Sequence, residues 1–504
     1  MARAQSTPSF IRRLASSGIW ALLGRVASIV TVLINYRLIC ERLGDDVAVY
    51  VICAGLAGLG TLVAGAGLST ALLRRFSSQD TAHTALNRKS LLLRVLALSA
   101  IAWLLVSASL FLLTAFLPNF FARPISGLVG LIALWVLGRT VLTIIAEALR
   151  SVQKFSLSAM YGGLQEGPYV NLSILACLLV YPAGMMDAPK VLAIHAVVTC
   201  FVAVLGTAQA FQVIAARDAE RSKEGEVATI NTGMEESTSA GVKVSASPPT
   251  TREIASESMK VLVSQMAIFG IVEFETLLVG KYCTDVEIGA WGAIRRVISV
   301  VSGPLLLINA AIPSFVAELY SKGDMRRLEK LLRFSSTIAT PPACIAFMLI
   351  FLFGKQILGY FDPSFEVGYP SLTILAASNI VFVAAGSAGL TLKMANRQGW
   401  ATVSTLILAV AYVLVAPVTA QRYGLVGIAV LSSVLVLARN VISTLLVKYF
   451  LNLWCVPSLS LEAIADFRQL LQQKRKRAKG KKGLAAQAAN AESVATESAV
   501  ETKA

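Results

Sequence analysis

The sequence predicts an all-α polytopic membrane protein, with twelve transmembrane helices in two six-helix bundles related by a pseudo-twofold axis around a central cavity. Composition is the first observation: of 504 residues, 56% are hydrophobic and only 15% are charged, and mean hydropathy is +0.69. These values exclude a soluble globular protein. The second observation is a recurrence of apolar spans of about 20 residues, and the third is a similarity between the two halves of the chain.

The apolar spans define the expected helices, since no alternating pattern of the kind a membrane β-barrel needs is present. In the first half they lie at 18–40, 47–73, 91–117, 127–149, 155–181 and 191–216. In the second half they lie at 261–282, 289–316, 334–353, 370–392, 401–421 and 425–450.

Four regions follow from these spans. Residues 1–216 are expected to form the N-terminal bundle and residues 259–456 the C-terminal bundle. The polar segment 217–258 contains Pro248-Pro249 and is expected to be a flexible cytoplasmic linker. Residues 457–504 are expected to be a basic cytoplasmic tail, and its KRKRAKGKKG run from Lys474 favours anionic membrane lipids.

The two halves align as repeats of the same topology. Cys40 aligns with Cys283, Gly18 with Val261, and STALLRRFSSQDTAHTALNRKSLLLR from Ser69 parallels PSFVAELYSKGDMRRLEKLLR from Pro313. Parallel repeats are related by an axis along the membrane normal, and their cavities lie between the halves. Most lysines and arginines of the loops fall on the side of the two termini, which predicts cytoplasmic termini. The first span is longer than a signal h-region and is expected to stay uncleaved.

The stretch from Phe269 to Arg296 places charges inside two apolar spans. A charge there costs at least ~2.5–3.5 kcal/mol, so such residues pair or face a wet cavity. Glu275 lies about seven residues before the turn between the spans, and Arg295 and Arg296 about seven after it, so all three sit roughly 10 Å below one surface. An acid and a base can therefore meet across this hairpin. The carboxylates Glu273 and Glu275 then serve either a structural ion pair or ion coupling.

Three stretches resemble the multidrug/oligosaccharidyl-lipid/polysaccharide exporter superfamily. They are ERLGDDVAVYVICAGLAGLG from Glu41, IGAWGAIRRVISVVSGPLLLINAAIPSFVAELYSKGDMRRL from Ile288, and RYGLVGIAVLSSVLVLARN from Arg422. More narrowly they resemble its polysaccharide branch, the bacterial flippases of lipid-linked repeat units. The resemblance implies two six-helix bundles, alternating access, the bacterial inner membrane, and an undecaprenyl-diphosphate-linked oligosaccharide for exopolysaccharide or O-antigen assembly. Such a flippase is not an enzyme and can work beside a polysaccharide polymerase and a chain-length regulator.

A diphosphate cargo predicts arginines in the cavity, because the planar guanidinium binds phosphate with two hydrogen bonds and stays charged. The alternative for each arginine is an internal ion pair or a side chain that reaches to the interface. Of the adjacent pair Arg295 and Arg296, one is expected in the cavity and the other paired. The candidates for substrate binding are Arg25, Arg139, Arg295, Arg296 and Arg439.

Ion coupling is expected to rest on Glu166, Glu273 or Glu275, since buried carboxylates can carry protons or hold Na⁺. Glu166 lies in the sequence GGLQEGPYVN, whose glycines and Pro168 would kink or open the helix. No Walker motif is present, no cofactor is expected, and the seven scattered Cys and two His suggest no metal site and no histidine relay.

Three other functions remain open. A multidrug exporter of the same superfamily would need acids rather than arginines in the cavity. A peptidoglycan-precursor flippase would have two further helices. A membrane glycosyltransferase or polymerase usually carries a large periplasmic loop, which is absent here. The basic residues lie in loops between apolar spans, so nucleic acid is not expected as a partner.

Overall fold

The computed structural model describes residues 7–65, 67–69, 72, 88–116, 125–152, 154–162, 166–231, 251–311, 316, 319–320, 323–395 and 398–457. Over these residues the chain is helical, and the only β-type pairing among them is a single bridge between Gly162 and Glu166. The all-α prediction is therefore confirmed.

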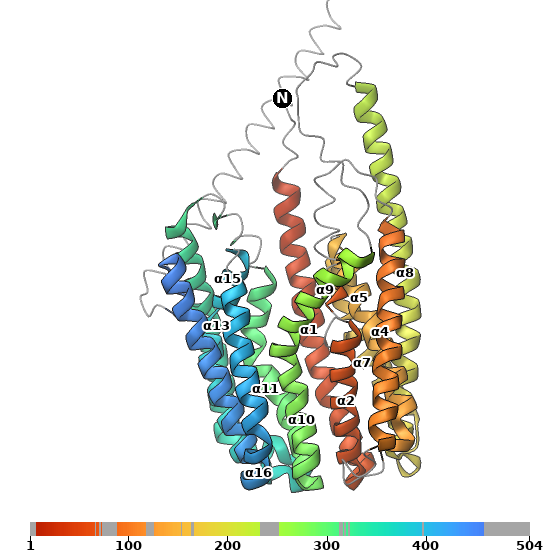
Figure 1. The fold of residues 1–504 in the computed structure, drawn as a ribbon, viewed down its shortest axis with the longest axis vertical. Helices are drawn as coiled ribbons and strands as arrows, with labels where there is room; N and C mark the ends of the chain where they lie inside the picture. Colours follow the sequence, from red (N-terminus) through yellow and green to blue (C-terminus); the bar gives the residue numbers. More distant parts are fainter. Residues whose placement is uncertain are drawn as a thin grey trace, which may run out of the picture.

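Figure 1 shows the N-terminal half, coloured red to yellow, beside the C-terminal half, coloured green to blue. The N-terminal half comprises α1 (Thr7–Leu43), η1 (Gly44–Asp46), α2 (Val47–Gly65), α4 (Arg88–Phe116), η2 (Ser126–Leu128), α5 (Val129–Ser151), α6 (Phe155–Tyr161), α7 (Pro168–Val180), η3 (Ala183–Met185) and α8 (Ala188–Asn231). The C-terminal half comprises α9 (Thr251–Gln265), the π-helical turn η4 (Met266–Gly270), α10 (Ile271–Tyr282), α11 (Asp285–Ala311), α13 (Met325–Gly359), η5 (Pro363–Gly368), α14 (Tyr369–Ala385), α15 (Ala388–Met394) and α16 (Gln398–Leu451).

Eight stretches of the described residues are long and apolar enough to cross a membrane. Two of these stretches reverse direction: Val26–Gly65 turns at Gly44 and Gly399–Leu451 turns at Gly424, both with positive φ. Each of these therefore supplies two of the predicted spans. The interrupted pair α6 and α7 supplies another span, and α11 supplies the last. The described helices thus account for all twelve predicted spans.

The segment 217–258, predicted as a flexible cytoplasmic linker, is helical in its first and last parts. α8 continues to Asn231 and α9 begins at Thr251, so helix occupies the first and last parts of the segment. The reason is local composition, because ARDAERSKEGEV is rich in Ala, Glu, Arg and Lys and has no proline. Pro248-Pro249 and the tail beyond Pro457 lie outside the described residues.

The two halves meet along two lines of contact, which together form the bundle interface. In one line α2 packs against α9, η4 and α10; in the other α1 and α2 pack against α11. Glycines permit the close approach: a Cβ at Gly58 would lie 2.6 Å from the Glu273 carboxyl carbon, and one at Gly280 would lie 2.6 Å from Ile52. We call the end of the molecule that carries the α1–α2 and α10–α11 turns, lowest in Figure 1, the hairpin end.

Candidate functional site

Glu166 lies at a break in the fifth membrane span. α6 ends at Tyr161, Gly162 has φ +97°, and α7 begins with Pro168 at its first turn. Only glycine fits at position 167, since a Cβ there would lie 2.4 Å from the Met160 carbonyl oxygen. The opening predicted from the glycines and Pro168 is therefore confirmed, and it places a carboxylate on irregular backbone inside the bundle.

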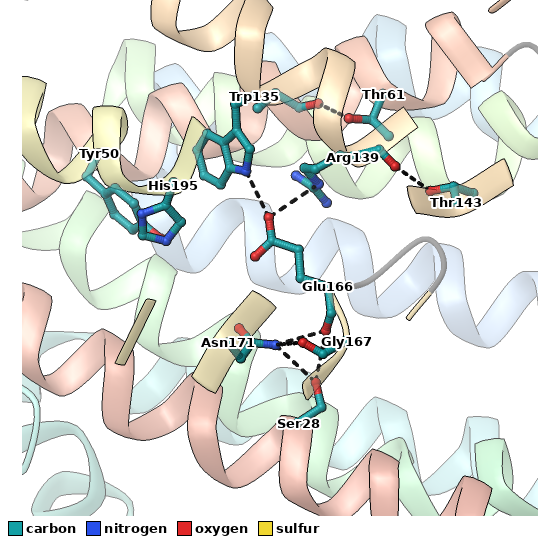
Figure 2. Close-up of polar contacts among 11 residues, drawn as sticks. Ser28, Tyr50, Thr61, Trp135, Arg139, Thr143, Glu166, Gly167, Asn171 and His195 are labelled. Atoms are coloured by element: carbon teal, nitrogen blue, oxygen red, sulfur yellow. Dashed lines mark hydrogen bonds and ion pairs between the residues drawn. The ribbon is translucent and has the colours of Figure 1, made fainter. Parts of the chain in front are cut away.

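The Glu166 carboxylate is held by groups of α5, as Figure 2 shows. The Trp135 indole N–H donates to Glu166 Oε1 at 2.8 Å, and Arg139 Nε lies 3.7 Å from the same oxygen. The side chains of Arg139 and Glu166 are each 16% exposed. Arg139, predicted as a substrate cation, is thus in an ion pair within the N-terminal bundle.

The break itself is supported by amide and hydroxyl groups. Asn171 Nδ2 donates to the carbonyl oxygens of Glu166 and Gly167, at 2.9 and 3.1 Å, and the Ser28 hydroxyl donates to the Glu166 carbonyl at 2.9 Å. Asn35 Nδ2 donates in turn to the Asn171 carbonyl at 2.9 Å. The bonds to Glu166 satisfy a carbonyl at the break, where the helical pattern is interrupted, and this lets irregular backbone persist at membrane depth.

A buried aromatic group borders the Glu166 site. Tyr50, Trp135 and His195 are each 3% exposed. The Tyr50 hydroxyl lies 3.2 Å from His195 Nε2, and the His195 and Trp135 rings lie 4.9 Å apart. None of these three residues was predicted to belong to this site. The signal was present, because a histidine inside an apolar span is costly unless it is hydrogen-bonded.

In the C-terminal half, Glu273 and Arg295 form a two-pronged ion pair across the α10–α11 hairpin. Arg295 Nη1 lies 3.0 Å from Glu273 Oε2 and Arg295 Nη2 lies 3.2 Å from Oε1. Arg295 also donates to the Thr276 hydroxyl, which accepts a second bond from the Trp291 indole at 3.2 Å. An acid and a base do meet across the hairpin, but the acid is Glu273 and not Glu275, the residue whose depth matched that of the two arginines.

Glu275 has a different environment from Glu273. It is 7% exposed, and its Oε1 accepts a hydrogen bond of 2.6 Å from the Ser432 hydroxyl of α16. The Tyr412 hydroxyl lies 3.2 Å from Ser432 Oγ. No ion pair of Glu275 occurs within 4 Å among the described residues, so the structural Glu–Arg pair considered for this residue is not formed there.

Arg296 lies at the bundle interface. Its guanidinium carbon is 3.8 Å from the centroid of the Tyr36 ring of α1, and its Nη1 donates to the Gly292 carbonyl at 2.7 Å. The Tyr36 hydroxyl donates to the Gly289 carbonyl at 2.7 Å. Within the described part of the chain, no carboxylate lies within 4 Å of Arg296, and its partners are the Tyr36 ring, the Gly292 carbonyl oxygen and the Tyr50 hydroxyl.

The remaining predicted cations are dispersed. Arg439 of α16 is half-buried, makes no ion pair within 4 Å with any described residue, and interacts electrostatically with Glu275. The side chain of Arg25 lies outside the described residues. Cys40 and Cys283 are free thiols. A search of the described residues for groups of three or more possible metal ligands finds none.

Comparison with known proteins identifies the fold. Residues 261–420, within the C-terminal half, match the MatE family model. Comparison with curated proteins gives no match. Several solved structures have the same fold over most of the chain.

One of these structures is a multidrug resistance MATE family transporter of the MOP superfamily in an inward-facing conformation, with TM-score 0.59, 15% identity, and coverage of 84% of this chain and 94% of the other. The lipid II flippase MurJ in an inward closed conformation has TM-score 0.59 and 12% identity, and the alignment covers 85% of this chain and 87% of MurJ. A MOP superfamily transporter from Pyrococcus furiosus, described as having a binding pocket of reversed polarity, has TM-score 0.59, 12% identity, and coverage of 87% and 95%. At these identities the likeness shows the fold, a membrane protein of two six-helix bundles.

Proposed function

We propose that this protein is a flippase that moves an undecaprenyl-diphosphate-linked oligosaccharide repeat unit across the bacterial inner membrane by alternating access, for exopolysaccharide or O-antigen assembly. The observation that carries the proposal is the environment of Arg296. A half-buried guanidinium at the interface of two bundles, whose partners are an aromatic ring, a backbone carbonyl and a tyrosine hydroxyl rather than a carboxylate, is a site for an anion.

The four candidate arginines whose side chains are described differ in whether a carboxylate lies beside them. Arg139 and Arg295 are neutralised by Glu166 and Glu273, so they add little net charge to a cavity. Arg296 and Arg439 make no carboxylate contact within 4 Å among the described residues. The diphosphate group is the charged part of the lipid-linked cargo, and arginine binds it with two parallel hydrogen bonds. We therefore assign Arg296 and Arg439 to the diphosphate, and Arg139 and Arg295 to supporting ion pairs.

Glu166 is the best candidate for ion coupling. Its carboxylate sits on a helix break, so uptake of a proton can change both its contact with Arg139 and the local backbone. Glu166→Gln is expected to transport at a rate that no longer responds to collapse of the proton gradient, whereas the wild type slows. Equal sensitivity of the two proteins in a flippase assay would exclude a proton role for Glu166.

The orientation follows from the basic loops: both termini are cytoplasmic and the hairpin end is periplasmic. Cargo then loads from the cytoplasmic side and leaves at the hairpin end. The basic tail would bind anionic lipids of the inner leaflet. A polysaccharide polymerase and a chain-length regulator are the expected partners, since they consume the flipped unit.

A second candidate is an ion-coupled multidrug exporter, and Glu275 favours it. A buried carboxylate that is hydrogen-bonded to Ser432, with no ion pair among the described residues, suits a cationic cargo. A peptidoglycan-precursor flippase is a third candidate, because its cargo carries the same diphosphate and MurJ shares the fold.

Reconstituted protein distinguishes these functions. Proteoliposomes would carry a fluorescent undecaprenyl-diphosphate oligosaccharide, lipid II, or a lipophilic cation, and transport of each would be measured. We expect flipping of the oligosaccharide lipid and, for Arg296→Gln, a loss of about 10-fold or more, since a charged hydrogen bond is worth about 1.5–3 kcal/mol.

The matched control is Arg327→Gln. The Arg327 side chain is 67% exposed and pairs with Asp324, the N-cap residue of α13, so this variant should transport at the wild-type rate. Export of the cation without any flipping would overturn the proposal in favour of the second candidate. Flipping of lipid II alone would overturn it in favour of the third.

A further inference from the structure

His195 of α8 connects the Glu166 site to the bundle interface through a chain of buried contacts. Its ring lies against Trp135, which donates to Glu166. On its other side the Tyr50 hydroxyl lies 3.2 Å from Nε2, and the Tyr50 ring lies 6.5 Å from the ring of Tyr36, on which Arg296 stacks. One end of this chain is a carboxylate of the N-terminal half, and the other is a guanidinium of the C-terminal half.

The hydrogen bonds of His195 define where a proton can bind. Nδ1 lies 3.0 Å from the Val191 carbonyl oxygen, one helical turn earlier. A carbonyl only accepts, so Nδ1 carries the hydrogen of the neutral ring and Nε2 is the free base. Nε2 then accepts from the Tyr50 hydroxyl. Proton uptake at Nε2 reverses this bond, since the imidazolium donates at both nitrogens and Tyr50 must accept.

The charged groups around His195 come from both halves of the molecule. Burial is the largest factor that opposes a positive charge on the ring; Glu166 favours that charge, and Arg296 of α11 and Arg139 of α5 oppose it. Of the other helices packed on α8, α7 has no charged residue and α4 has its cations, Arg88, Lys89 and Arg94, near its opposite end. Arg296 alone among these groups belongs to the C-terminal half, so its distance from His195 depends on whether the halves are together.

We infer that His195 is the proton-accepting residue through which pH controls separation of the two bundles at the hairpin end. A proton on Nε2 places a second positive charge near Arg296 across the interface, and moving α11 away from α1 relieves the repulsion. Linkage makes the effect reciprocal: separation of the bundles favours binding of the proton to His195, and binding of the proton favours separation of the bundles. The inference rests on the proposed function, because alternating access is what gives the separation a role.

The chain contains a reporter for this movement. Cys40 lies on α1 one turn after Tyr36, is 2% exposed, and has Arg296 and Asp362 of the C-terminal half among its electrostatic neighbours. Separation of α1 from α11 would expose its thiol. Alkylation of Cys40 by N-ethylmaleimide, followed by peptide mass spectrometry, measures this exposure in the full chain without any cargo.

The experiment uses the full-length protein in lipid nanodiscs between pH 5.5 and pH 8, the range in which histidine titrates. Each rate is divided by that of Cys40 in the unfolded chain at the same pH, which removes the ordinary titration of the thiol. We expect the normalised rate to be at least about fivefold higher at pH 5.5 than at pH 8, the lower bound of typical coupling between sites. A wild-type rate independent of pH would overturn the inference.

Three variants identify the residue. In His195→Gln the normalised alkylation rate of Cys40 should no longer depend on pH. In His83→Gln, a change at the other histidine of the sequence, the pH dependence should be the same as in the wild type. Arg296→Gln should also flatten it, since the opposing charge is gone. A full response in His195→Gln or in Arg296→Gln would overturn the assignment.

Tyr50→Phe is the fourth variant and serves if His195→Gln does not fold. The hydroxyl binds an imidazolium more strongly than a neutral ring, so its loss should move the midpoint of the response to lower pH. An unchanged midpoint would overturn the inference.

Failure of this inference can be told apart from failure of the proposed function, because the alkylation experiment uses no cargo. If Cys40 responds to pH but no cargo is flipped in proteoliposomes, the proposed function is rejected and this inference stands. If cargo is flipped but Cys40 does not respond to pH, this inference is rejected and the proposed function stands.

Discussion

The ion pair Glu273–Arg295 of the C-terminal half and the ion pair Glu166–Arg139 of the N-terminal half differ in the backbone that carries them. Glu273 and Arg295 lie on continuous helices, meet through two hydrogen bonds of 3.0 and 3.2 Å, and sit against Gly58 of the opposite half. Glu166 lies on a helix break, and its contact with Arg139 is longer, at 3.7 Å. Trp135 shares the Glu166 carboxylate oxygen with that arginine.

From this difference we propose that the C-terminal pair is structural and that the N-terminal pair is functional. A pair on rigid helices at the bundle interface stabilises the packing of the two halves and has little freedom to change. A carboxylate on irregular backbone, with a long ionic contact, can exchange partners at low cost. We therefore expect substitutions in the C-terminal pair to act mainly on stability, and those in the N-terminal pair to act mainly on transport.

The largest expected effect is on stability. Glu273→Gln removes the charge that compensates Arg295, and breaking such a pair costs about 3–5 kcal/mol when it is well buried. Glu166→Gln should cost less, because the ionic contact is longer and an amide oxygen still accepts from Trp135. Thermal unfolding of both variants in detergent measures the difference.

The double variant Glu273→Gln with Arg295→Met is the control for that comparison. Removing both charges should recover much of the lost stability, since no unpaired guanidinium remains. A larger loss for Glu166→Gln than for Glu273→Gln would contradict the assignment of the C-terminal pair as the structural one.

The second prediction concerns the helix break. Gly167→Ala places a Cβ 2.4 Å from the Met160 carbonyl, and overpacking of this kind costs about 1–3 kcal/mol. Gly130→Ala in α5 is the matched control, because the space beside Gly130 is open. Unfolding temperature and flipping rate should both fall for Gly167→Ala and stay unchanged for Gly130→Ala. If Gly167→Ala kept the wild-type unfolding temperature and flipping rate, the helix break would tolerate a side chain at this position.

The smallest effect compares two buried tryptophans, one in each half. Trp135 donates to a carboxylate and Trp291 donates to the Thr276 hydroxyl. Replacement by Phe removes one N–H in each case, and a bond to a charged group is worth about 1 kcal/mol more than a neutral one. Trp135→Phe should therefore destabilise by about that much more than Trp291→Phe in parallel unfolding measurements. Equal losses would mean that Glu166 is not charged in the folded protein.

Much of the fold was predictable because a membrane-spanning helix can be recognised in a sequence by the length and the apolar composition of its segment. The break near Glu166 was predictable too, because glycines and a proline inside an apolar span interrupt a regular helix. The reversal between the last two spans falls at Gly424, between the predicted ends 421 and 425.

The partners of the charges were not predictable from one sequence. Glu273 and Glu275 are two residues apart, and that step rotates a side chain about 200° around the helix. One therefore reaches Arg295 and the other reaches Ser432, which is 157 positions away in the sequence. Which acid takes which role depends on the rotation of each helix, and rotation is fixed by packing between helices that hydropathy does not record.

The line of contact between α2 and α9–α10 has one further consequence. Gly55, Gly58 and Gly67 face Thr276, Glu273 and Ser258 in turn, so a row of positions without side chains in the N-terminal half lies against α9 and α10. Few side chains of the N-terminal half would have to be displaced along this row if the two halves rotated against each other. We expect this line to serve as the pivot of the molecule, with Tyr36 and Arg296 at the part that swings furthest.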